Sequence, residues 1–181
     1  MMNGLPADAQ WFANKIKSFE KDPAYLTEVK AQDVLFKEEE DRKALFSQQF
    51  QQADESYWDE TVKKLQQGAK AKVSESAMDE RLLAWLSLAF YSISNQLITA
   101  NHNKEASYFV DLYQLADKTN SEAWYLSAVL NARDNNYAAA KQDLIKAIGL
   151  GFNDRERFAS QPEFNNPGNK LDFNELGSAL K

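Results

Sequence analysis

Histidine offers the most versatile chemistry in this sequence, and the chain contains one, His102. An imidazole can act as a general base near neutral pH or bind a transition metal, so either kind of site would have to include this residue. The sequence contains no nucleophile motif of the Gly-x-Ser-x-Gly type, and no cysteine to act as a nucleophile or zinc ligand. Asparagines flank His102 on both sides, as is typical of a turn, and we expect a solvated turn residue.

The carboxylates and amides also lack the spacing of a catalytic or ion-binding site. Residues 38–41 (EEED) form the densest acidic run. Consecutive residues of a helix point around its axis, so we expect a solvated face there. Residues 134–136 (DNN) and 165–166 (NN) resemble neither a calcium loop, whose ligands alternate and end in Glu, nor a phosphate loop, which needs glycines and lysine. The prediction is a protein that is not an enzyme and has no catalytic, cofactor-binding or metal-binding residue.

Charge and hydropathy restrict the partners of the chain. The net charge is −6 and no basic stripe is present, which disfavours nucleic acid. No apolar run reaches the roughly 18 residues of a membrane span. The first residues, MMNGLPADAQ, contain neither the basic nor the apolar region of a signal peptide. We therefore expect a soluble chain without direct membrane insertion, cytoplasmic or, if an upstream export signal has been removed, periplasmic.

Helices are predicted along most of the chain, because glycine (6) and proline (4) are scarce and no strand-like alternation is present. The fold class is therefore all-α. Predicted helices cover residues 6–20, 23–50 and 54–68, with either a continuous second helix or one break within its charged part. Residues 80–98 are apolar nearly all round, so this helix is expected to be central.

A repeated pattern of residue types connects the two parts of the second half of the chain. Ala123-Trp124-Tyr125 has an earlier counterpart in Ala89-Phe90-Tyr91, and Ala140 has Ala106 at the same offset. The turns that precede the two alanines match in character as well. A bulky ring near the start of one helix needs a depression to enter, and small residues let neighbouring helices approach. We therefore expect Trp124 in a core between stacked helical hairpins.

This pattern resembles the tetratricopeptide repeat, a helix–turn–helix unit with a period of about 34 residues, which is the offset found here. Residues 121–152 match its aromatic and small positions well, at Trp124, Ala128, Tyr137, Ala140 and Ala147. Residues 87–120 form a more degenerate unit. The resemblance implies a superhelical array of bacterial type in a single all-helical domain, 1–181. It would comprise N-terminal helices in 1–76, repeats in 77–152 and a cap with a short helix in 153–181, where Asp172 would open a last helix.

The resemblance also implies where a partner would bind. First-helix residues of such repeats line a concave groove, and here they are Tyr91, Asn95, Glu122, Tyr125, Val129 and Arg133. An aromatic ring and a cation on the same side of one helix, Tyr125 and Arg133, could hold an extended peptide or a carboxylate. We expect a non-catalytic scaffold that binds another protein or peptide. The alternative is an envelope-associated binder of a small ligand or glycan, and an upstream export signal would favour it; the oligomeric state is left open.

Overall fold

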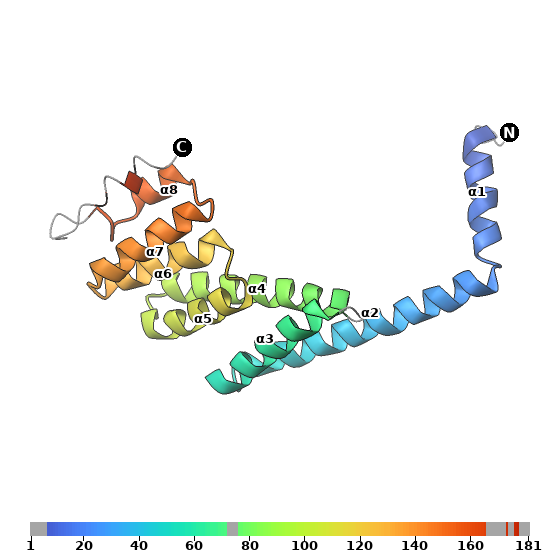
Figure 1. Ribbon diagram of the computed structural model, residues 1–181, viewed down its shortest axis with the longest axis horizontal. Coiled ribbons are helices and arrows are strands. Elements are labelled where there is room, and N and C mark those ends of the chain that lie inside the picture. Colours follow the sequence, from blue (N-terminus) through green and yellow to red (C-terminus); the bar gives the residue numbers. More distant parts are fainter. Residues whose placement is uncertain (1–6, 72–75, 166–172, 174–175, 178–181) are drawn as a thin grey trace. The chain divides into compact units, whose positions relative to one another are not determined.

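The computed structural model (Figure 1) describes residues 7–71, 76–165, 173 and 176–177. The described residues form eight helices and no strand, which confirms the all-α expectation. Contacts divide the chain into two compact units, Met1–Gln52 and Ala53–Lys181. The sequence pattern predicts the N-terminal helices in residues 1–76, so the boundary between the units falls within that range. The last helix predicted from Asp172 lies mostly outside the described residues.

The described residues of the first unit form two helices, α1 (Ala7–Phe19) and α2 (Pro23–Gln49). Asp22 caps α2, and its carboxylate accepts a hydrogen bond of 2.9 Å from the backbone of Ala24. The helix continues without a break through its charged part, where Arg42 pairs with Glu38 at 2.8 Å. Such pairs, one helical turn apart, support a helix by a few tenths of a kcal/mol each, about 0.2–0.5 kcal/mol.

In the second unit, the described residues form six helices. They are α3 (Glu55–Lys70), α4 (Ser76–Thr99), α5 (Asn103–Ala116), α6 (Ser121–Arg133), α7 (Tyr137–Gly149) and α8 (Arg155–Ser160). Helix α4 packs along α5, and α6 along α7, so that two neighbouring hairpins are visible in Figure 1. Helix α5 packs on α6, and α3 packs on both α4 and α5. The core of the unit lies between these helices.

Helix α4 is the most apolar of the described helices. It is long and apolar enough to cross a membrane, with a mean hydropathy of 1.2 over 18 of its residues. Among the described residues, no other helix meets this criterion. A central helix of a packed domain has the same composition. Here α4 contacts α3, α5 and α6, and Leu82, Leu86 and Phe90 on it are fully buried. These contacts are those expected of a central helix, but 28% of its apolar stretch is buried, so the helix is covered only in part.

The turns of the two hairpins have the same backbone geometry. Asn101 and Asn135, which occupy equivalent positions in the two hairpins, both have φ of 61°, the left-handed conformation. In each turn the next N–H donates to the carbonyl five positions back, at 2.9 Å in the first and 2.8 Å in the second. This is the Schellman end of a helix, usually formed by glycine and sometimes by asparagine. Helix α7 ends in the same way at Gly151, with φ of 105° and a bond of 2.9 Å.

The buried residues follow the repeat in part. Ala106 and Ala140 are both fully buried, as expected for small residues at helix contacts. Trp124, expected in the core, is instead only half-buried. Its indole donates to the carbonyl of Lys118 at 3.2 Å, and the ammonium of Lys146 lies 3.5 Å from its ring centre. The ring is large and amphipathic, so it lies at the edge of the hairpin where its N–H and a cation can reach it.

The aromatic core position is occupied in the first repeat by Phe90, the counterpart of Trp124. Phe90 is fully buried and packs edge-on against Trp58 of α3, with ring centres 5.5 Å apart. Helix α3 therefore covers Phe90 in the first hairpin. Phe90 lies in the core for this reason, whereas Trp124 lies at the edge of the second hairpin.

We predict that Phe90→Ala lowers the free energy of unfolding by about 3–5 kcal/mol, because it leaves a cavity between α3 and α4. Leu88→Ala is the matched control on the same helix. Leu88 is 65% exposed, so its truncation should change stability by less than about 0.5 kcal/mol. Urea denaturation measures both variants. Equal losses in the two would contradict the assignment of the core.

The left-handed turns give a second prediction. Asn101→Val should cost about 1–2 kcal/mol, because a β-branched residue is strained at positive φ. Asn101→Gly should stay within about 0.5 kcal/mol of the parent chain, because glycine adopts this conformation freely. The same pair of substitutions at Asn135 should give the same result. Thermal unfolding that tolerates valine at both sites would show that these turns are not left-handed.

Candidate functional site

The predicted groove residues do not form one surface in the structure. Two of them, Tyr91 and Glu122, line a hollow of about 460 Å³ between α4 and α6, here called the α4–α6 groove. Its lining residues are Ala84, Ser87, Leu88, Tyr91, Tyr113, Asp117, Asn120 and Glu122. Asn95 is half-buried, and its amide donates to the carbonyl of Tyr91 on its own helix at 2.9 Å.

The α4–α6 groove combines aromatic and acidic groups. The rings of Tyr91 and Tyr113 meet edge-on with centres 5.9 Å apart. Burial, and then the charges of Glu122 and Asp117, raise the pKa of the Tyr113 hydroxyl above its ordinary value. The phenol therefore stays protonated and able to donate a hydrogen bond at physiological pH. Leu88, 65% exposed, adds an apolar side chain at the rim.

Tyr125, the predicted aromatic contact for a peptide, is inaccessible. It is fully buried and stacks on Phe152, with ring centres 4.3 Å apart and planes 15° from parallel. Phe164 meets the ring edge-on at 6.0 Å, and the Tyr125 hydroxyl donates to the amide oxygen of Gln161 at 3.2 Å. Burial raises the pKa of Tyr125 to about 12, against the opposing effect of Arg157. The neighbouring groove prediction, Val129, is buried as well.

Arg133, the predicted cation of the groove, is engaged within the chain. Its Nε donates to Glu163 at 2.6 Å, and its Nη1 donates to the carbonyl of Ile98 at 2.8 Å and to Asn103 at 3.0 Å. The guanidinium thus links the end of α4, the start of α5 and the segment after α8. The C-terminal segment occupies the surface where the repeat pattern predicted an external peptide.

Glu163 is held ionised by this contact. Burial alone would raise the pKa of its carboxyl, but hydrogen bonds from Arg133 and Gln161 outweigh burial and lower it below the ordinary value. The side chain is 15% exposed, so solvent screens the pair only partly. Together Arg133 and Glu163 stabilise the C-terminal segment on the second hairpin.

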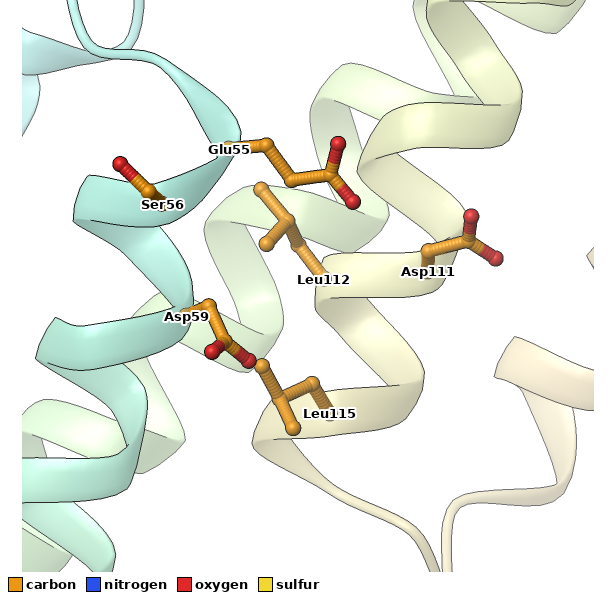
Figure 2. A pocket seen from close by; sticks show the side chains of 6 residues that line it. All are labelled: Glu55, Ser56, Asp59, Asp111, Leu112 and Leu115. Atoms are coloured by element: carbon orange, nitrogen blue, oxygen red, sulfur yellow. The ribbon is translucent and has the colours of Figure 1, made fainter.

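A second hollow, of about 530 Å³, lies between α3 and α5 and was not predicted (Figure 2). We call it the α3–α5 hollow, and its six lining residues are Glu55, Ser56, Asp59, Asp111, Leu112 and Leu115. Figure 2 shows the carboxylates of Glu55 and Asp111 and the leucines of α5 around one space. In the sequence, Glu55 and Asp59 are one helical turn apart, which indicates a shared face. Nothing in the sequence indicated that α5 would pack beside this face of α3.

The groups that could do acid–base chemistry are dispersed. His102 is exposed and immediately precedes α5, and its side chain makes no capping hydrogen bond. Within the described residues, no three histidine, aspartate or glutamate side chains are arranged to hold a metal ion. The α4–α6 groove and the α3–α5 hollow are therefore the candidate sites, and both are lined by helices that the core holds in place.

Comparison with protein families, with characterised proteins and with solved structures finds no match to this chain. The function must therefore be inferred from the arrangement of its own residues. Hollows lined by apolar and polar groups between packed helices are typical of ligand-binding surfaces. Neither candidate site contains the histidine of the chain.

Glu163→Gln should lower the free energy of unfolding at neutral pH by about 1–3 kcal/mol, because it leaves a partly buried guanidinium without its anion. The pKa of Glu163 is lower in the folded state than its ordinary value of 4.5. Its contribution to the free energy of unfolding is therefore fully present above pH 4.5, the ordinary value, and is lost as the pH falls below that value. The stability difference between parent and variant should therefore shrink in acid.

Urea denaturation at neutral and at acidic pH measures this difference. Glu80→Gln, at an exposed position of α4, is the control and should change stability by less than about 0.5 kcal/mol. A constant difference across the pH range would contradict the role assigned to the Arg133–Glu163 pair.

Proposed function

We propose that this chain is a non-catalytic helical-repeat scaffold of the tetratricopeptide type, which binds a segment of another protein. The observation that carries the proposal is the repeated turn. Asn101 and Asn135 lie one repeat length apart and share both φ and the hydrogen bond that closes the helix. The match of residue types is therefore accompanied by a match in the backbone of the two turns, which supports the proposal. A fixed period with equal turns is typical of solenoid arrays.

The packing of the helices supports the same proposal. Helices α4 and α5 form one hairpin, α6 and α7 form the next, and α5 packs against α6 between them. In an array of this kind, the first helices of successive hairpins line one face. Helices α4 and α6 are those helices here, and the α4–α6 groove lies between them.

The α4–α6 groove suits a peptide better than a reaction. Leu88 and the two tyrosine rings can contact an apolar side chain of a peptide. Asp117 already accepts hydrogen bonds from Thr119, and Glu122 pairs with Arg157, so these carboxylates contribute negative charge at the rim of the groove. On the second hairpin, the predicted groove residues Tyr125, Val129 and Arg133 are buried or engaged by the C-terminal segment, so most of the lining of the available groove comes from the first hairpin and the turn after it. Tyrosine is a favourable contact residue because it gives a large area at low entropic cost.

Site-specific photo-crosslinking in the cells that produce the chain tests this function. A photoreactive amino acid at Leu88 should form a covalent adduct with a discrete protein, which mass spectrometry identifies. The matched control is Ile145 on α7, which is exposed (52%) but outside the groove. Tyr91→Ala in the Leu88 background should reduce the adduct. Equal adducts at both positions, or none at Leu88, would contradict a binding groove.

A further inference from the structure

Two hollows of the second unit meet at Asp111. One is the α3–α5 hollow of about 530 Å³. The other, of about 200 Å³, lies between α5 and α6, and both Asp111 and Asp134 line it. We call the four carboxylates along these hollows, Glu55, Asp59, Asp111 and Asp134, the acidic track. The helices that line it belong to one compact unit.

The negative charge of the acidic track is poorly compensated. Among the described residues, Glu55 and Asp111 have no ion-pair partner, whereas Asp59 pairs with Lys63 on its own helix. Burial, and then the charges of Glu55 and Asp143, raise the pKa of Asp111 above its ordinary value. Like charges therefore face one another across the α3–α5 hollow, and a cation placed there would be stabilised by all of them.

The negative charge of the acidic track also acts on the hydroxyl of Tyr108. Its oxygen is buried and has no hydrogen-bond partner within the described part of the chain. Burial, followed by the charges of Glu55 and Asp54, raises the pKa of this phenol. The phenol thus remains protonated, and the negative charge of Glu55 contributes to this. Tyr108 lines neither hollow, so the carboxylates and leucines that do line them are the groups that a partner would contact.

The floor of the α3–α5 hollow is apolar. Leu112 and Leu115 line it from α5, and Figure 2 shows Leu112 near Glu55 and Leu115 near Asp59. An ion alone would gain nothing from these leucines. A chain segment that carries both an aliphatic side chain and a cation could fill the hollow and neutralise its rim.

We propose that the acidic track binds a partner segment in which lysine or arginine alternates with aliphatic residues. This inference rests on the proposed function and names the chemical class of the partner at a second surface. A bound metal ion is less suited, because the described carboxylates do not converge on one point. A nucleic acid would be repelled by the track. Because carboxylates line both adjoining hollows, we expect the partner segment to carry more than one cation.

The test uses the full chain and a synthetic peptide of alternating leucine and arginine, blocked at both ends. Methyl NMR should show shifts at Leu112 and Leu115 when the peptide is added, while the buried Leu126 of α6 stays unchanged. A peptide of alternating leucine and glutamine is the charge control and should bind about tenfold more weakly. Binding of the arginine peptide should also weaken as salt is added.

The double variant Glu55→Gln/Asp111→Asn should reduce affinity for the arginine peptide about tenfold. Its fold is expected to be retained, because the substitutions remove repulsion within the hollow. The matched control, Glu80→Gln/Glu156→Gln, removes the same net charge at exposed positions outside the track and should bind as the parent does. Equal loss in both double variants, or no shift at Leu112 and Leu115, would overturn the proposal.

The two proposals can fail separately. If Leu88 yields no specific adduct while the peptide still binds the acidic track in the expected way, the proposed function at the α4–α6 groove is wrong. If the Leu88 adduct forms but the track variant binds the arginine peptide as the parent does, the present inference alone is wrong.

Discussion

The close approach of helices at small residues is the constraint on which the second unit depends. Ala106 and Ala140 have no accessible surface, and each lies near the start of the second helix of a hairpin. A larger side chain there would push the two helices apart and separate the turns from the core. The buried leucines of α4 and the contact between the rings of Phe90 and Trp58 belong to the same core, whose interior is packed to nearly crystalline density.

The features predicted correctly from the sequence are those that depend on local interactions. The sequence predicted helix starts near residues 23 and 54, and in the structure Asp22 and Asp54 cap these helices by accepting a backbone hydrogen bond. The equal turns at Asn101 and Asn135 were visible as a match of residue types at a constant offset. Such features follow from a few neighbouring residues, so a sequence pattern is sufficient to locate them.

The features that the sequence could not supply depend on contacts between distant residues. Tyr125 and Arg133 have the residue types of a peptide-binding groove, yet their partners are Gln161 and Glu163, which lie beyond the whole of the second hairpin. Local pattern cannot distinguish a partner in the same chain from one in another molecule. The pairing of α3 with α5 that forms the α3–α5 hollow is also a matter of packing. Phe90 is buried where Trp124 is not for the same reason.

The position of Arg133 has a consequence for how the α4–α6 groove would meet a partner. A rigid and permanently charged guanidinium bridges the last turn of α4, the beginning of α5 and the C-terminal segment. In the scaffold that we propose, small rotations between the hairpins would set the curvature of the array, and the contacts of Arg133 would oppose such a rotation. A partner of the proposed α4–α6 groove would then meet a surface whose two hairpins are already held together, which lowers the entropic cost of association.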